Sequence, residues 1–378
     1  MITDPLALAA ILTAVVWVAL QLERRLAAFK ALGAALVGIL LGMVLSNTGL
    51  VPGTSPTYDW LSSTGVSLAV VLILLNVDLD SIRSAGPRMF VAFLIGAVAT
   101  AVGALIGFVT VGRAVGPEGW KLAGQFTDTY TGGGMNFAAL GRAFDTSADL
   151  FTAAVAADVA LTAVWMAACL VAPLLIGRSA IAASDDDATD DAAPVSVAQS
   201  LTSSIQPVVI ADLAALIAIA AAALWTAGWL ANTIPALPEV LWLSTIALGL
   251  AQIAPIRKLH GGALLGNYLL LLFLAANGAQ SVLANIFRVG PAVFWFAAIT
   301  ITVHGVGIFG IGKLMGIDAG TLAVASQANV GGPASAVALA GARGYADRVL
   351  PGVAVGLLGY AVGNYSGFLI ANLVRTLL

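Results

Sequence analysis

Long apolar stretches separated by short polar breaks run along almost the whole chain. About 20 apolar residues suffice for a helix to cross a bilayer, and a helix satisfies its own backbone hydrogen bonds there. The pattern therefore predicts an all-α polytopic membrane protein with 10–12 membrane segments, embedded in the lipid bilayer. The twelve candidate segments are 5–22, 30–50, 61–77, 87–112, 119–142, 147–177, 204–231, 239–256, 261–282, 290–314, 319–343 and 347–377.

Composition excludes several classes of protein. Hydrophobic residues make up 60% of the chain and charged residues 9%, which is outside the range of soluble globular domains. No basic surface for a nucleic-acid partner is expected. One cysteine, Cys169, and two histidines exclude an intrachain disulfide and the usual zinc sites. No nucleophile, base and orienting group occur together, so we expect neither an enzyme nor a cofactor other than a coupling ion.

Two of the apolar segments, 119–142 and 319–343, contain glycines within a polar sequence. The first carries Gly132–Gly134 and the second Gly331–Pro333. Glycine costs a helix about 1 kcal/mol relative to alanine, and proline removes a backbone donor. We predict that both helices are interrupted, either as broken spanning helices or as re-entrant hairpins that meet near the membrane midplane. The freed backbone groups would then be satisfied by protein, water, an ion or a substrate.

The residues that flank both interruptions are polar. Hydroxyl and amide oxygens suit a hard cation such as Na⁺, and helix N-termini suit an anionic group. Close packing through small residues is the structural alternative. The expected substrate- or ion-binding residues at the first interruption are Thr127, Asp128, Thr129, Tyr130, Thr131, Gly132, Gly133, Gly134 and Asn136. Those at the second are Ser326, Gln327, Asn329, Gly331, Gly332 and Ser335.

Three ionisable side chains are candidates for coupling. Asp158 lies near the centre of segment 147–177, where a carboxylate is costly, so we expect it to bind Na⁺ or to take up a proton. Asp128 is a second candidate Na⁺ ligand. His304 is expected to pack beside an interrupted helix, where a buried His is more often a satisfied hydrogen-bonding group than a switch. Across the core it could nevertheless form a proton-sensitive pair with Asp158. A hydrogen bond with a purely structural role is the alternative for each.

The two halves of the chain, 1–177 and 204–378, resemble each other beyond the glycines. Residues 178–203 form an acidic run that predicts a flexible linker between them. The residues that recur place segments two to six in correspondence with segments eight to twelve, as in transporters built from two repeats of about five segments. The recurring residues are Leu72–Leu75, Gly86, Pro87 and Phe90 in the first half and Leu271–Leu274, Gly290, Pro291 and Phe294 in the second.

The distribution of basic residues bears on orientation. If both interrupted segments are re-entrant, the repeats are inverted. Eleven Lys and Arg residues then lie on the cytoplasmic side of the membrane and five on the external side. With all twelve segments spanning, the split is nine to seven and the repeats share one direction. The count favours inversion. Broken spanning helices are also a consistent alternative, since the Lys and Arg residues divide ten inside to six outside if segment 204–231 does not span the membrane.

The run Tyr130–Ala139 resembles the signature of the bacterial membrane proteins known as domain of unknown function 819, and Asp78-Leu79 is similar to that family's pattern. Gly134 stands where the signature usually has Ser. The resemblance implies membership of the cation:proton antiporter and anion transporter superfamily, with bile-acid, citrate and glutamate symporter-like relatives. It also implies crossed discontinuous helices, a dimerisation domain, elevator-type alternating access and a homodimer in the bacterial inner (cytoplasmic) membrane. Asp158 is similar in position to the ion-binding aspartate of the antiporters, although Ala157 precedes it where Asp or Asn is usual.

Residues and resemblance together predict a Na⁺- or H⁺-coupled symporter of a small organic solute, either an organic anion or an amino-acid-like molecule. The solute would bind between the two interruptions, and an anion would depend on helix N-termini because no Lys or Arg lies in mid-segment. A cation/proton antiporter that uses Asp158 is the alternative. A membrane scaffold or sensor without transport is the third hypothesis.

Overall fold

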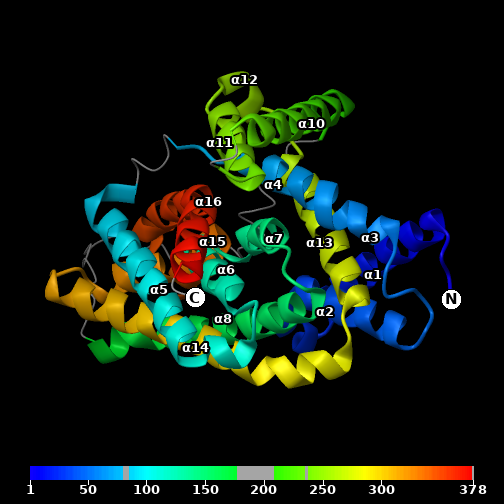
Figure 1. The fold of residues 1–378 in the computed structure, drawn as a ribbon. Coiled ribbons are helices and arrows are strands. Elements are labelled where there is room, and N and C mark those ends of the chain that lie inside the picture. The colour runs from blue at the N-terminus through cyan, green and yellow to red at the C-terminus, as the bar shows by residue number, and fades with distance from the viewer. Residues whose placement is uncertain (80–84, 177–207, 235–236, 377–378) are drawn as a thin grey trace.

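The computed structural model describes residues 1–79, 85–176, 208–234 and 237–376 (Figure 1). Within these ranges the chain forms helices joined by turns, with no β-strand. This confirms the predicted all-α fold. The acidic linker predicted at 178–203 lies outside the described residues.

The elements of the first half are α1 (Pro5–Arg25), α2 (Ala27–Asn47), α3 (Pro56–Trp60), a π-helical turn (Leu61–Gly65), α4 (Val66–Leu74), α5 (Gly86–Val115), α6 (Gly119–Gly132), α7 (Gly134–Ala143) and α8 (Ala148–Ile176). Among the described residues, this half contains three long membrane helices, α1, α5 and α8, together with a kinked α2, the stretch from α3 to α4 and the interrupted pair α6 and α7. The second half contains α10 (Ile210–Thr233), α11 (Glu239–Ala251), α12 (Ala254–Arg257), α13 (Gly262–Gln280), α14 (Leu283–Leu314), α15 (Ala319–Ala342) and α16 (Ala346–Arg375).

Eight helical stretches among the described residues are long and apolar enough to cross a membrane: α1, α3 to α4, α5, α8, α10, α13, α14 and α16. Two shorter apolar helices, Gly33–Asn47 within α2 and α11, add to them. Together with α6–α7 and α15, these elements account for the twelve segments predicted from the hydropathy pattern. The chain is a multi-pass helical membrane protein.

Local signals explain several helix ends. The Asp4 side chain accepts a hydrogen bond from the Ala7 amide, and that of Asp318 accepts one from Thr321. Each satisfies an amide at a helix start that has no partner within the helix. Helix α5 ends just before Gly116, whose backbone has a φ of 103°. Residues with a side chain rarely adopt this backbone conformation, so glycine is suited to the position that stops the helix.

The helices pack as two groups, and each group combines helices from both halves. In the first group, α5 packs on α14, α6 on α16, and α15 on α5, α8 and α16. In the second group, α2 packs on α1 and α13, α4 on α13, and α10 on α11. Figure 1 shows α10, α11 and α12 at one edge of the molecule, with α6, α7 and α15 in its middle.

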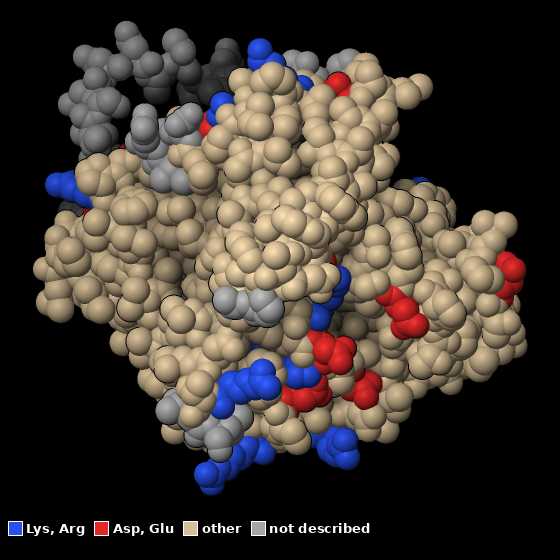
Figure 2. Space-filling model, turned by 45° about the horizontal axis from the view of Figure 1, so that its top comes forward, with Lys and Arg blue, Asp and Glu red and all other residues tan. Residues whose placement is uncertain are grey.

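The surface fits a lipid environment. Large apolar side chains such as Val109, Trp225 and Phe287 are exposed. Most of the face seen in Figure 2 is uncharged, and the charged side chains gather in separate patches. Such a surface is stable where the surrounding solvent is hydrocarbon rather than water.

Candidate functional site

The first interrupted element turns at a single residue. Helix α6 ends at Gly132 and α7 begins at Gly134, with Gly133 between them at φ 81° and ψ 164°. This region of backbone conformation is open almost exclusively to glycine. The Gly133 amide still donates to the Thr129 carbonyl at 2.7 Å, so the break is local. The interruption predicted in segment 119–142 is present.

The second interrupted element has the same conformation at its break. Gly332 lies at φ 72° and ψ −167° inside α15 and is followed by Pro333. Glycine supplies the unusual conformation, and proline has no amide hydrogen to continue the helix. The interruption predicted in segment 319–343 is present as well.

The two breaks are in direct contact. A Cβ atom placed on Gly133 would lie 3.1 Å from the amide nitrogen of Gly332 and 3.3 Å from the carbonyl carbon of Gly331. Helix α16 packs against both breaks through its own glycines. A Cβ on Gly356 would lie 2.7 Å from the nitrogen of Pro333. The backbones therefore approach as closely as they do because none of these residues has a side chain.

Several polar side chains next to the breaks are buried with no hydrogen-bond partner or with only a loose one. On α6 the hydroxyls of Thr129 and Thr131 have no partner, while the Asp128 carboxylate and the Tyr130 phenol interact loosely with Asn136 and Asp158. On α15 the complete amide groups of Gln327 and Asn329 share this property. An unsatisfied buried polar group costs about 1–3 kcal/mol. The concentration of such groups at the two breaks singles out this region as the candidate site.

Asp158, from α8, lies beside the first break. Its Oδ2 atom would be 3.7 Å from a Cβ on Gly134, and the Thr129 hydroxyl oxygen would be 3.8 Å from the same point. Thr162, one turn further along α8, donates to Asp158 Oδ1 at 3.4 Å. The Tyr130 phenol also interacts with this carboxylate. The structure thus brings Asp158, Thr129 and Tyr130 together, as oxygen donors that suit a cation.

Asp128 faces a different neighbour, the glycine-rich surface of α16. A Cβ on Gly363 would lie 2.6 Å from the Asn136 amide nitrogen and would collide with Asp128. Asn136 interacts with Asp128 and donates to the Tyr360 carbonyl at 3.1 Å. Asp128 and Asn136 therefore lie where α6, α7 and α16 meet.

His304 does not pair with Asp158 in this structure. Its Nδ1 atom lies 2.9 Å from the Thr100 hydroxyl and 3.0 Å from the Gly96 carbonyl, and its Nε2 lies 2.9 Å from the Ser326 hydroxyl. Both ring nitrogens are therefore engaged by α5 and α15. The expectation of a His304 and Asp158 pair is corrected: His304 links the second interrupted helix to its neighbours.

The remaining sequence candidates occupy structural positions around the breaks. Thr127 donates back to the Ala123 carbonyl within α6 at 2.7 Å, so its hydroxyl is satisfied by its own helix. Ser326 accepts a further hydrogen bond from the Trp165 indole at 2.9 Å. Ser335 packs directly beside Gly331 on the far side of the second break.

A cavity of about 470 Å³ opens where the two helix groups meet. Gly134, Gly331 and Asp158 bring both breaks and the acidic side chain to its wall. We call it the central cavity. Glu23, Asn267, Phe137, Phe151 and Tyr360 also line it, although sequence reasoning selected none of them. They come from α1, α13, α7, α8 and α16, so no sequence motif joins them.

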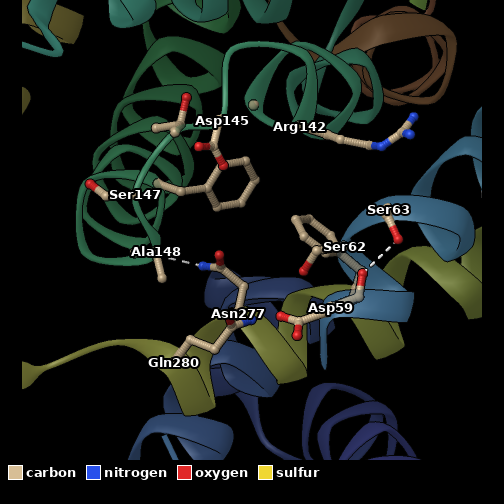
Figure 3. A pocket seen from close by; sticks show the side chains of 13 residues that line it. Asp59, Ser62, Ser63, Arg142, Asp145, Ser147, Ala148, Asn277 and Gln280 are labelled. Carbon is tan, nitrogen blue, oxygen red and sulfur yellow. Dashed lines mark hydrogen bonds between the residues drawn. The ribbon is translucent and has the colours of Figure 1, made fainter. Parts of the chain in front are cut away.

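A second cavity of about 460 Å³, here the outer cavity, lies among the α3 region, the turn after α7, and α13 (Figure 3). Figure 3 shows the carboxylates of Asp59 and Asp145 on different walls of it. Phe151 lines both cavities. Its ring centre lies 5.0 Å from that of Phe137 and 5.5 Å from that of Phe273, so an aromatic layer separates the two spaces.

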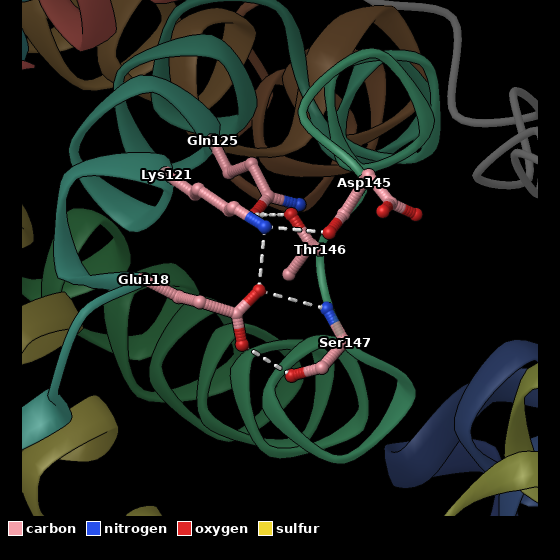
Figure 4. Close-up of polar contacts among 6 residues, drawn as sticks. All are labelled: Glu118, Lys121, Gln125, Asp145, Thr146 and Ser147. Atoms are coloured by element: carbon pink, nitrogen blue, oxygen red, sulfur yellow. Dashed lines mark hydrogen bonds and ion pairs between the residues drawn. The ribbon is translucent and has the colours of Figure 1, made fainter.

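Polar contacts join the two ends of the first interrupted element (Figure 4). Glu118, just before α6, accepts from Lys121 at 2.6 Å and from the Ser147 amide and hydroxyl at 3.1 and 2.6 Å. Lys121 also donates to the Asp145 carbonyl at 2.5 Å. Burial opposes ionisation of Glu118, but the hydrogen bonds from Lys121 and Ser147 and the charge of Lys121 hold its pKa below the usual value.

The second interrupted element is joined in the same way. Asp318, before α15, lies 3.2 Å from Arg348 at the start of α16 and accepts from the Thr321 hydroxyl at 2.6 Å. Burial raises the pKa of this carboxyl, but the Thr321 hydrogen bonds and the Arg348 charge outweigh it and leave the pKa low. Each interrupted element is thus tied by a carboxylate to the chain that follows it.

These features define a multi-pass helical membrane protein whose two interrupted helices meet beside a partly buried carboxylate, Asp158. The family model described as Protein of unknown function (DUF819) matches residues 6–377, and the chain belongs to this family. The chain is also similar to the Uncharacterized membrane protein YjcL of Bacillus subtilis (strain 168), with 28% identity over 374 residues that cover 94% of each protein. The family resemblance of the Tyr130–Ala139 run is confirmed.

Proposed function

We propose that this protein is a secondary active transporter: a Na⁺- or H⁺-coupled symporter of a small organic solute. The solute binds in the central cavity and the coupling ion binds at Asp158. One observation carries the proposal: two interrupted helices meet at their breaks beside Asp158, at the wall of a cavity between two groups of helices. Interrupted helices that meet at membrane depth are typical of secondary transporters.

The ion site is proposed to consist of Asp158 with the hydroxyls of Thr129 and Tyr130. An intramembrane carboxylate surrounded by hydroxyl oxygens can bind Na⁺ directly or exchange a proton. Asp128, with Asn136 beside it, is the second candidate for the ion. The buried amides of Gln327 and Asn329 extend the polar surface on the side of the second break.

The architecture is proposed to consist of two inverted repeats, α2 to α8 and α11 to α16. The packing supports this, because three contacts have a counterpart: α2 on α13 and α11 on α4, α6 on α16 and α15 on α8, α5 on α16 and α14 on α8. The ties at Glu118 and Asp318 further support re-entrant hairpins, since each interrupted element begins and ends at the same end of the molecule.

The direction of the first helix in each repeat supports inversion too. Asn47, at the end of α2, donates to the Ser281 carbonyl, and Ser281 donates to Ala148 at the start of α8. Glu239, at the start of α11, pairs with Arg142 near that same end of the molecule. Thus α2 ends where α11 begins. By the positive-inside rule we propose that the opposite end, where α1 finishes with Arg24 and Arg25, faces the cytoplasm.

The working cycle is proposed to be of the elevator type in a homodimer of the bacterial inner membrane. The group α5–α8 with α14–α16 holds both breaks and Asp158, and would move against the other group. The central cavity lies between the two groups, where such a movement changes its access.

A cation/proton antiporter is the second candidate. It is favoured by Asp158 itself, whose partners are hydroxyl groups and not a basic side chain, so a cation and a proton can compete for it. A scaffold or sensor without transport is the third, and it assigns no role to the cluster of buried polar groups without partners.

Reconstitution into proteoliposomes tests the proposal. An imposed Na⁺ or pH gradient should drive uptake of a labelled solute from a panel of amino acids, organic acids and amines, and Asp158→Asn should abolish it. Asp347→Asn, at an exposed carboxylate, is the matched control and should leave uptake unchanged. If protons move in exchange for Na⁺ without any organic solute, the symporter hypothesis is rejected and the antiporter hypothesis is supported. Ion fluxes and uptake that are absent in the wild-type protein would overturn both.

A further inference from the structure

The central cavity has a one-sided charge. Of the described residues that line it, the charged ones are Asp158 and Glu23, and both are acidic. Neither forms an ion pair within the part of the chain that the structure describes. A carboxylate held in a largely apolar surrounding without a counter-charge is costly, so a positively charged ligand would stabilise it.

The rest of the cavity wall is apolar and aromatic. Leucine, alanine and valine side chains line it, together with the rings of Phe137, Phe151 and Tyr360. Burial of apolar ligand surface against such a wall contributes about 25 cal/mol per Å². Aromatic rings also attract a cation to their faces. The wall therefore suits an apolar body that ends in a positive group.

A buried hydroxyl without a partner marks where the positive group would bind. Thr129 is 0% exposed and its oxygen has no hydrogen-bond partner. This oxygen and Asp158 Oδ2 both lie within 4 Å of the position that a Cβ atom on Gly134 would take. Gly134 is a residue of the cavity wall. An ammonium group has hydrogen-bond donors and no acceptor, and so matches a carboxylate beside a hydroxyl oxygen.

We infer that the central cavity takes an organic amine: a positively charged ammonium group held by Asp158 and Thr129, with an apolar body against Phe137 and Phe151. Glu23, on α1, gives the same cavity a second negative charge. An organic anion would lie next to two carboxylates and would be repelled by both. This inference rests on the proposed transport function and narrows its solute class. Because the ammonium group would occupy Asp158 in place of Na⁺ or a proton, it favours the antiport form of that function, in which the amine and the coupling ion bind Asp158 in turn.

Three compounds that share a phenylethyl body test the charge preference on the purified full-length protein. Phenethylamine, 3-phenylpropionate and 2-phenylethanol are cationic, anionic and neutral at neutral pH. Phenethylamine at millimolar concentration should raise the melting temperature saturably, and the other two should not. A shift with 3-phenylpropionate that equals or exceeds the amine shift, or no shift with the amine, would overturn the inference.

Variants locate the effect. Asp158→Asn combined with Glu23→Gln should remove the amine shift, and Asp347→Asn should retain it. Both changes keep the side-chain volume and remove only charge, so the variants should fold. An amine shift that survives in the double variant would show that the amine binds elsewhere.

A parallel measurement separates this inference from the proposed function. The melting temperature is compared in Na⁺ and in K⁺, and over a range of pH, without any organic compound. An ion-dependent shift that needs Asp158, together with no amine preference, would reject the amine and keep ion coupling. The absence of both an ion-dependent and an amine-dependent shift would reject the transporter itself.

Discussion

The backbones of Gly133 and Gly332 touch each other, although the two residues lie in different halves of the chain. A Cβ atom on Gly133 would be 3.1 Å from the Gly332 nitrogen. Both residues adopt nearly the same glycine-specific conformation, with φ of 81° and 72°. The contact fixes the positions of the two interrupted helices relative to each other, and Asp158 of α8 lies beside one of them.

Gly133→Ala should damage this contact. The added methyl group crowds Gly332, and the conformation of Gly133 costs a residue with a side chain about 1–3 kcal/mol. We expect a lower melting temperature and a loss of ion-dependent stabilisation. Gly310→Ala, on α14, is the control, because nothing lies within 4 Å of the added methyl. Equal effects of the two substitutions would contradict a special role for the break.

His304→Gln should lower stability without changing ion dependence. His304 links Gly96, Thr100 and Ser326, and the loss of hydrogen bonds in a buried site costs about 1–3 kcal/mol. Because His304 does not contact Asp158, the effect of Na⁺ and of pH on the melting temperature should persist. Asp158→Asn should show the opposite behaviour. Loss of the pH effect in His304→Gln would show that the two side chains are coupled.

The ties at Glu118 and Asp318 should weaken in acid. The pKa of each carboxyl is lower in the folded protein than its ordinary value, 4.5 for Glu118 and 3.8 for Asp318. Their contribution is therefore complete above those ordinary values and is lost as pH falls through the lowered folded pKa. Glu118→Gln should lower the melting temperature by about 1–3 °C at neutral pH, and this difference should disappear in strong acid.

The measurement is a thermal melt of wild type and Glu118→Gln in detergent across the acidic range. Glu239→Gln, at a more exposed ion pair with Arg142, is the comparison. A difference between wild type and Glu118→Gln that grows towards acid would contradict the assigned direction of the pKa.

Phe151→Leu should connect the outer and central cavities. The smaller side chain opens the aromatic layer formed with Phe137 and Phe273, while an apolar residue keeps the helix packed. A cysteine at Ala138, which lines the central cavity, should then react faster with a membrane-impermeant thiol reagent added outside spheroplasts. Phe287→Leu, at an exposed ring, should leave the rate unchanged. Equal rates in both backgrounds would show that Phe151 does not separate the cavities.

Several features of the fold could be read from the residues alone. Apolar runs of membrane length predicted the helices, because a segment in hydrocarbon must satisfy its backbone within itself. Gly132–Gly134 and Gly331–Pro333 predicted the two interruptions, because their effect on a helix is local. The partners of His304 could not be predicted in this way. They come from α5 and α15, and which side chains face one another across helices depends on packing angles that no single segment specifies.

The sequence by itself determined the helical membrane fold, the two breaks and the polar character of their flanks, since each follows from local composition and backbone preference. The tertiary structure alone decided that the breaks touch and that Thr129 lies with Asp158 while Asp128 faces α16. It also decided that Glu23, Phe137 and Phe151 share one cavity with Asp158. The physical reason is that these contacts join helices distant in the sequence, and they form only when small residues let those helices approach closely.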